Sequence, residues 1–197
     1  MTPTAFTWPY WPVFAATIIW AYLPESKIVR AAGKAIKHTG SRDKGSFQVI
    51  VYAGGIASTI AVAIAWLPFL RMSLAVRPIA FGFGIAAIVL GSLLRRHCFR
   101  VLGASFTGDV RAAADQRIVT TGAYRLLRHP SYTAGILMNI GFGFTLGNWA
   151  SLLLLTLAPF AVYSYRIAVE ERALLTVLGD PYRDFMRTRR RLVPFIY

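Results

Sequence analysis

Five stretches of the chain are almost free of charged residues and are long enough, or nearly so, to cross a bilayer as helices. A spanning helix needs roughly 20 apolar residues, with a lower limit near 17. The pattern predicts an all-α integral membrane protein with about five transmembrane helices, over residues 6–23, 47–70, 78–94, about 132–146 and about 149–165. For the last two stretches, the alternative is a re-entrant hairpin around a tight turn at Gly147 and Asn148.

The distribution of charge indicates how these spans are oriented. The chain has 22 Lys and Arg against 8 Asp and Glu. With five spans and the N-terminus outside, 20 of the basic residues and all the acidic ones fall on the cytoplasmic side, and two basic residues, Arg71 and Arg77, fall outside. This asymmetry satisfies the positive-inside rule. Trp8, Trp11 and Trp149 then lie at the outer interface, as expected for interfacial tryptophans. The N-terminus is predicted outside, and the C-terminus in the cytoplasm.

Composition excludes several other classes of protein. Hydrophobic residues make up 56% of the chain, which rules out intrinsic disorder and is too much for a soluble domain of this size to bury. The lone Cys98 rules out a disulfide scaffold. The basic residues flank the spans, so we expect no nucleic-acid partner. We expect a single membrane domain over residues 1–197, with three spans in 1–99 and the remaining two in 100–197.

Candidate chemistry begins at the predicted start of the fourth span. Pro130 is tolerated in a first helical turn, where free N–H groups can meet a carboxylate or a ribose hydroxyl. His129 precedes it, and is either a ligand contact or an interfacial histidine satisfied by backbone. Gly135, Gly141 and Gly143 follow within the span, and they allow close approach of either a ligand or another helix.

A second candidate follows the fifth span, where Arg166 and Glu170 are four residues apart and share one helix face. A charged group this close to the membrane either serves a site or forms an ordinary interfacial ion pair. Cys98, next to His97, has no partners at metal-ligand spacing, so we expect no metal site. No P-loop, Rossmann glycine pattern or Ser/His/Asp arrangement is present.

Two motifs in this half of the chain resemble those of the isoprenylcysteine carboxyl methyltransferase family, which is related to the phospholipid N-methyltransferases. The first is Ile118-Val-x-x-Gly-x-Tyr-Arg-x-x-Arg-His-Pro-x-Tyr132. The second is Arg166-x-x-x-Glu-Glu-x-x-Leu-x-x-x-x-Gly-x-x-Tyr182, and Val193-Pro194 ends the match. The chain departs from the family at Ala134, where the family usually has glycine; Gly135 comes next.

The resemblance implies S-adenosylmethionine as the methyl donor, bound on the cytoplasmic side by the fourth and fifth helices and their flanks. It implies that Arg166 orients the carboxylate of the acceptor. It also implies a set of donor contacts: Gln116, Arg117, Ile118, Val119, Tyr124, His129, Pro130, Ser131, Tyr132 and Glu170.

The resemblance leads us to expect carboxyl O-methylation of a prenylated cysteine or a similar lipophilic acid. An ionised carboxylate needs no general base; an amine or thiol acceptor would need one, and His129 or Glu171 are the candidates. Phospholipid amines and thiols are therefore alternative acceptors. Two alternative hypotheses come from other functional classes: the protein is an NADPH-dependent membrane reductase, or it is a non-enzymatic membrane subunit. The expected partners are membrane lipid and a lipophilic or lipidated acceptor.

Overall fold

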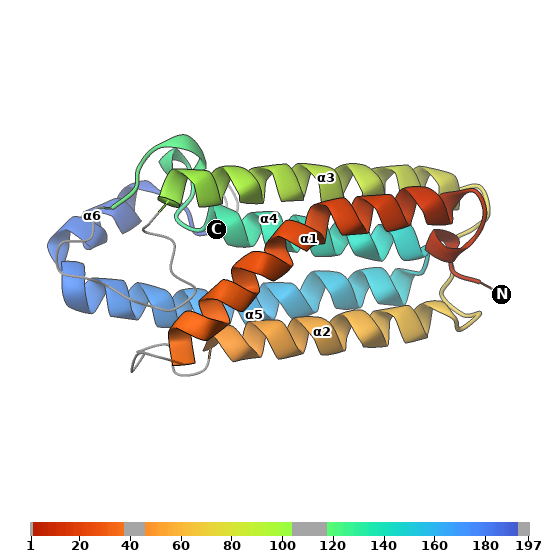
Figure 1. The fold of residues 1–197 in the computed structure, drawn as a ribbon, viewed down its shortest axis with the longest axis horizontal. Helices are drawn as coiled ribbons and strands as arrows, with labels where there is room; N and C mark the ends of the chain where they lie inside the picture. Colours follow the sequence, from red (N-terminus) through yellow and green to blue (C-terminus); the bar gives the residue numbers. More distant parts are fainter. Residues whose placement is uncertain (1, 38–45, 104–117, 193–197) are drawn as a thin grey trace.

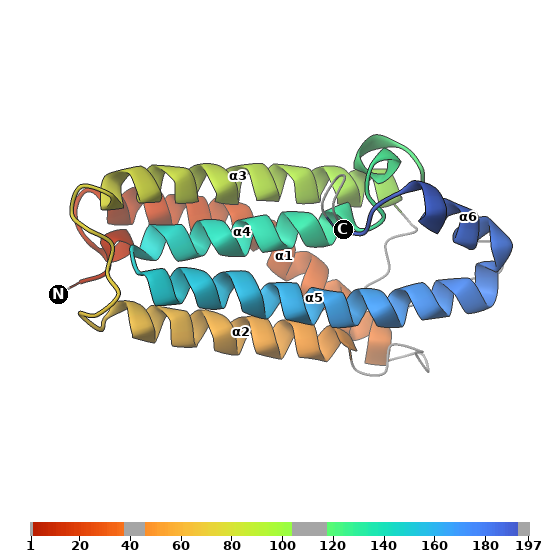
Figure 2. The same ribbon diagram turned by 180° about the vertical axis from the view of Figure 1, so that it is seen from behind.

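Long helices running side by side make up nearly all of the structure, a computed structural model that describes residues 2–37, 46–103 and 118–192 (Figures 1 and 2). Between these ranges lie two connections that are left undescribed. The elements in chain order are η1 (Thr4–Phe6), α1 (Tyr10–Lys37), α2 (Ser46–Ala65), α3 (Arg77–Leu102), η3 (Gly122–Arg125), α4 (Pro130–Leu146), α5 (Trp149–Leu178) and α6 (Asp180–Thr188).

The outward faces of these helices are apolar. Ile79, Phe83 and Leu90 of α3 and Leu153 of α5 are each about three-fifths exposed or more. Patches of this extent on a protein mark a surface that is covered by something other than water. Within the described residues, α2, α3 and α5 are long and apolar enough to cross a membrane. α1 is not among these three helices and α4 has only 17 residues, so five spans remain a prediction.

Small residues let the backbones of α3 and α4 approach each other closely. A methyl group added to Gly84 would lie 2.6 Å from the carbonyl oxygen of Gly141, and one added to Gly141 would lie 2.6 Å from that of Gly84. Gly143 likewise lies against the backbone of Leu152 on α5. These two glycines of the predicted fourth span therefore serve close helix packing, as is common in membrane bundles.

The turn predicted between α4 and α5 is confirmed. Gly147 has a left-handed backbone with φ of 70°, which glycine adopts without steric cost. The Asn148 side chain then caps α5 by accepting from the N–H groups of Ala150 and Ser151. The two helices form an antiparallel hairpin, and this hairpin fixes which parts of α4 and α5 face each other.

Several helices extend beyond the predicted spans. α1 continues to Lys37, α3 to Leu102 and α5 to Leu178, because charged residues end an apolar span without ending a helix. α2 stops earlier than predicted, at Ala65. The carbonyl oxygens of Ala65, its last residue, and of Trp66, which follows, each accept a hydrogen bond from Nη2 of Arg71 at 3.2 Å.

Candidate active site

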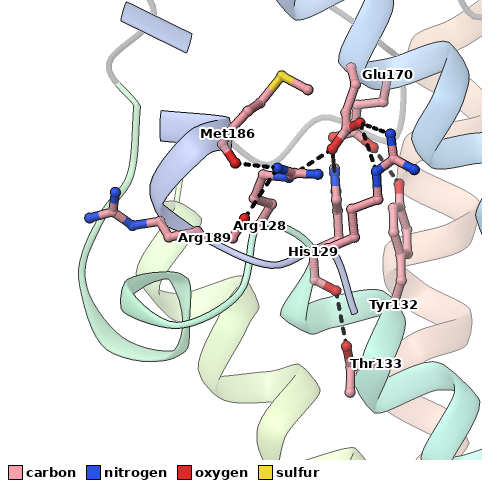
Figure 3. A network of polar contacts seen from close by, with 9 residues as sticks. Arg128, His129, Tyr132, Thr133, Glu170, Met186 and Arg189 are labelled. Atoms are coloured by element: carbon pink, nitrogen blue, oxygen red, sulfur yellow. Dashed lines mark hydrogen bonds and ion pairs between the residues drawn. The ribbon is translucent and has the colours of Figure 1, made fainter. Parts of the chain in front are cut away.

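The first turn of α4 and the C-terminal half of α5 meet at the end of the bundle away from the Gly147 turn (Figure 2). We use the name C-terminal segment for α6 together with residues 189–192. This segment folds back over the same end of the bundle. The polar side chains of these parts of the chain form one connected network, drawn in Figure 3. The two motifs identified in the sequence are thus brought together by the α4–α5 hairpin.

Glu171 is the most highly connected carboxylate of this network. It is 3% exposed, and its Oε1 lies 2.9 Å from Nε of Arg128 and 3.2 Å from Nε2 of His129. Its Oε2 lies 3.2 Å from Nε and 3.1 Å from Nη2 of Arg191. A buried carboxylate is tolerated only when it is paired in this way. Glu171 therefore joins α5 to the start of α4 and to the C-terminal segment.

Tyr132 is the centre of a second set of contacts. Its hydroxyl donates to Oε2 of Glu170 at 2.7 Å and accepts from Nε of Arg166 at 3.3 Å. Arg166, only 4% exposed, also interacts electrostatically with Glu170. The Tyr132 ring stacks on His129, with centroids 5.6 Å apart, and on Tyr163, with centroids 5.0 Å apart. One hydroxyl thus links the arginine and the glutamate that the sequence placed on one helix face.

The C-terminal segment pairs with the residues that precede α4. The N–H groups of Arg128 and His129 donate to the carbonyl oxygens of Arg190 and Arg191, at 2.8 and 3.1 Å. Leu127 and Arg190 form a parallel β-bridge. His129 is therefore held by its backbone on one side and by its ring, through Glu171, on the other.

Side chains reinforce this pairing. Nη1 of Arg128 donates to the carbonyl oxygens of Met186 at 2.7 Å and Arg189 at 3.1 Å (Figure 3). The Thr133 hydroxyl donates to the carbonyl oxygen of Leu192 at 2.6 Å. Arg128 thus binds α6 and Glu171 at once.

A layer of buried groups lies between the network and α3. Nη1 of Arg95 donates to the carbonyl oxygen of Ser131 at 2.8 Å. The Tyr124 hydroxyl lies beside Ser131 and the thiol of Cys98. Burial, with Cys98 adding to it, raises the pKa of Tyr124 well above its ordinary value. Tyr124 therefore stays a neutral hydroxyl at physiological pH.

Tyr182 of α6 lies near enough to Glu171 and Glu170 to interact with them electrostatically. It is buried, and its ring packs against Phe185 with centroids 5.8 Å apart. Burial raises the pKa of Tyr182, and the neighbouring carboxylates of Glu171 and Glu170 raise it further. A protonated phenol beside two carboxylates adds no negative charge to the site.

Comparison with known proteins identifies the family. The sequence model of the family described as phospholipid methyltransferase matches residues 79–180, slightly more than half of the chain. The chain belongs to this family. The match runs from the start of α3 to just beyond the end of α5, so it contains the start of α4 and the charged residues of α5, whereas Arg191 lies outside it.

Two curated relatives agree with this placement in the phospholipid methyltransferase family. Protein-S-isoprenylcysteine O-methyltransferase B of Arabidopsis thaliana is 30% identical over 116 residues, covering 58% of this chain and 59% of the relative. The protein-S-isoprenylcysteine O-methyltransferase of Schizosaccharomyces pombe is 34% identical over 119 residues, covering 59% and 49%. The chain therefore spans about half to three-fifths of the length of these relatives.

A solved structure has the same fold. The eukaryotic intramembrane Ras methyltransferase, isoprenylcysteine carboxyl methyltransferase, superimposes with a TM-score of 0.55 over 95% of this chain and 63% of its own, at 22% sequence identity. The helical membrane fold predicted from the sequence is confirmed, and the protein is an integral membrane protein of this family.

The structure brings most of the predicted site residues together. His129, Tyr132, Arg166 and Glu170 belong to the network. Pro130 and Ser131 form the first turn of α4, and Tyr124 lies beside Ser131. Ile118 and Val119 are half-buried and outside any helix. Gln116 and Arg117 lie outside the described residues. The Nε2 atom of His129 contacts the Glu171 carboxylate, so a side chain engages this ring nitrogen, and contact of the ring with a ligand stays a prediction.

Sequence reasoning missed the roles of Arg128 and Arg191. Arg128 lies inside the first motif and was given no role, and Arg191 was counted only as a basic residue of the tail. The available signal was Glu171, an acidic residue on a long apolar helix, because such a charge needs a cationic partner. The sequence does not say which of the many arginines supplies that partner.

Proposed function

We propose that the protein is an S-adenosylmethionine-dependent methyltransferase that acts on the carboxylate of a prenylated cysteine or a similar lipophilic acid. The observation that carries the proposal is the junction of the two motifs at Tyr132, whose hydroxyl contacts both Arg166 and Glu170. The two curated relatives are protein-S-isoprenylcysteine O-methyltransferases, which supports the same reaction.

The groups around Tyr132 fit a cationic donor. Glu170 offers a carboxylate to the donor's ammonium group, and stacked aromatic rings are a favourable neighbour for a sulfonium. His129, Tyr132 and Glu170 would hold the donor, with Tyr124, Pro130 and Ser131 beside them. Ile118, Val119, Gln116 and Arg117 are proposed as further contacts. When bound, the donor supplies an activated methyl group on a positively charged sulfur.

Arg166 would hold the acceptor. A guanidinium can bind a carboxylate through two parallel hydrogen bonds, which fixes its direction. Arg166 is buried on α5 directly after the apolar stretch of this helix, and this position suits an acceptor whose lipid part lies in the bilayer. Alignment of the carboxylate and exclusion of water are then the main contributions of the chain.

The pairing of Glu171 favours a carboxylate acceptor over an amine or a thiol. An amine or a thiol must lose a proton, and Glu171 is one of the two candidate bases. Both of its oxygens are engaged by Arg128, His129 and Arg191, and a carboxylate surrounded by cations is a weak base. The ring of His129, the other candidate base, is engaged by this same carboxylate through its Nε2 atom. A phospholipid amine is the second candidate acceptor, because the family is named for phospholipids.

We also propose the orientation and the domain organisation read from the sequence. The N-terminus would lie outside and the network would face the cytoplasm, where the donor is found. The charge asymmetry across the bundle supports this orientation. Residues 1–197 would form one membrane domain, with the first three helices shaping the acceptor side.

Incubation of the purified protein with labelled S-adenosylmethionine tests the acceptor. The panel contains farnesylcysteine, phosphatidylethanolamine and a small thiol, and label should be transferred to the first. Transfer only to phosphatidylethanolamine would establish the second candidate. S-adenosylhomocysteine should raise the melting temperature and NADPH should not, because a ligand stabilises the state that binds it. A shift with NADPH alone would contradict the proposal.

Two substitutions separate the proposed roles of the donor and acceptor contacts. Arg166→Ala should abolish turnover and leave S-adenosylhomocysteine affinity nearly unchanged in calorimetry. Glu170→Ala should first weaken that affinity, by roughly ten- to a hundredfold for the loss of one charge-assisted contact. Asp184→Asn, in an exposed ion pair on α6, is the matched control and should alter neither. Equal loss of donor affinity in both site variants would show that the roles are misassigned.

A further inference from the structure

We propose that Tyr163 is a positioning residue of this site, which holds the Tyr132 hydroxyl between Arg166 and Glu170; this inference rests on the proposed methyl transfer. Tyr163 lies outside both sequence motifs, on the part of α5 that enters the membrane. It acts through the ring on which it stacks.

Tyr163 shares one stripe of α5 with the two charged residues of the site. Positions 163, 166 and 170 are separated by three and then four residues, so they lie on one face of the helix. This face is turned toward Tyr132, which contacts all three side chains. Tyr163 is 8% exposed, and its ring lies nearly parallel to that of Tyr132, at an interplanar angle of 19°.

Gly135 provides the room for Tyr163. A methyl group added to Gly135 would lie 2.5 Å from the Tyr163 hydroxyl oxygen, 3.0 Å from Cζ and 3.1 Å from Cε2. Gly135 follows Tyr132 by three residues, so both lie on the same face of α4. The Tyr163 ring is therefore confined between the backbone of α4 at Gly135 and the ring of Tyr132.

This confinement matters because Tyr132 makes two directional contacts with one oxygen. The donated hydrogen bond to Glu170 and the accepted one from Arg166 both require that oxygen at a fixed place. A Tyr132 ring without its neighbour can shift, and a misplacement of about 1 Å can lower a rate by roughly a hundredfold. The position of the Tyr132 hydroxyl between Arg166 and Glu170 thus depends, through the stacked rings, on how α4 packs against α5.

Four variants test the inference, with kcat, the KM for donor and acceptor, and the melting temperature as measurements. Tyr163→Leu removes the stack and should lower kcat by about ten- to a hundredfold, with a smaller change in either KM. Tyr163→Phe keeps the stack and should retain most of the activity. Gly135→Ala should lower kcat, because the added methyl group displaces Tyr163. The double variant G135A/Y163F should recover part of that loss, because the nearest atom to the added methyl group is the hydroxyl oxygen.

Two substitutions are matched controls, because the same chemical changes are made where nothing is packed. Tyr52→Leu on α2 removes an exposed tyrosine, and Gly82→Ala on α3 adds a methyl group with no atom within 4 Å. Both should leave kcat at the wild-type value. A merely structural role of Tyr163 would lower the melting temperature without the selective loss of kcat and without the rescue.

Each outcome has a defined meaning. Wild-type kcat in Tyr163→Leu would overturn this inference and leave the proposed function intact. If Tyr163→Leu fails to fold, the comparison of Gly135→Ala with the double variant G135A/Y163F decides. A kcat of the double variant no higher than that of Gly135→Ala would overturn the inference. A wild-type protein that neither binds S-adenosylhomocysteine nor transfers a methyl group would overturn the proposed function, and this inference with it.

Discussion

Glu171 is the buried carboxylate of the site that contacts the most ionisable side chains. Two arginines and one histidine approach its two oxygens, and they come from the start of α4 and from the C-terminal segment. The desolvation of such a cluster is costly, so its gain is realised only while every partner is in place. This residue thus serves assembly of the site, whereas its neighbour Glu170 faces Tyr132.

Glu171→Gln should destabilise the protein strongly. Glutamine keeps the shape but leaves Arg128 and Arg191 without their counter-charge, and breaking a buried pair costs about 3–5 kcal/mol. Because Arg191 is partly exposed, we expect the lower end of this range, measured as a lowered melting temperature in detergent. Asp180→Asn, which breaks an exposed pair with Arg183, is the control and should change stability by less than about 1 kcal/mol. A Glu171→Gln protein as stable as this control would show that the network contributes nothing to stability.

At the scale of whole helices, glycines let α3 and α4 approach each other closely. Gly84 and Gly141 bring the backbones of α3 and α4 together, and Gly91 does the same beside Ala134 and Met138. In a membrane, where apolar side chains gain little from leaving lipid, such close contacts are a main source of helix association. The position of α4 against α3 therefore depends on residues that have no chemistry of their own.

Gly141→Ala should separate α3 from α4. Its new methyl group would lie 2.6 Å from the backbone oxygen of Gly84 and 2.8 Å from the backbone nitrogen of Ile88, and neither can move without moving its helix. The cost of overpacking is about 1–3 kcal/mol, read as a lowered melting temperature. Gly54→Ala on α2, with no atom within 4 Å, should not destabilise the protein. An equal effect of the two substitutions would contradict the packing explanation.

The helices and the α4–α5 turn were predictable from the sequence, but the helix ends were not. Hydropathy marks where the chain leaves the membrane, and α5 continues as a helix for 13 residues after the predicted end at residue 165. Those added turns carry Arg166, Glu170 and Glu171. The motif residues could be placed near one another from the family resemblance. The pairing of Arg128 and Arg191 with Glu171 could not, because it depends on how α6 folds back.

For the molecule as a whole, the described structure has one end made of short turns and one end rich in arginine. The turns contain Arg71, Gly147 and Asn148, which are tied by hydrogen bonds such as that from the Asn148 side chain to the carbonyl oxygen of Phe69. The other end carries the network of Figure 3. An asymmetry of this kind is expected when the two ends face different compartments.

Single-cysteine labelling tests the proposed orientation. Cys98 is buried and is the only cysteine, so Cys98→Ala gives a clean background. In that background, Leu74→Cys lies in the exposed connection between α2 and α3, and Arg183→Cys lies on the exposed face of α6. A membrane-impermeant maleimide should label the first in intact cells and the second only after permeabilisation. The reverse pattern would invert the orientation.

The lengths of the two arms of the α4–α5 hairpin determine which residues meet at its open end. Tyr132 and Tyr163 lie at nearly equal distances along the chain from the Gly147–Asn148 turn, so they meet only while both arms keep their lengths. One residue inserted into either arm would rotate everything beyond it by about 100°, since a helix has 3.6 residues per turn. Tyr163, Arg166 and Glu170 would then face away from Tyr132, although the insertion lies far from any of them. The alignment of the proposed site at one end of the bundle thus depends on the turn at the opposite end.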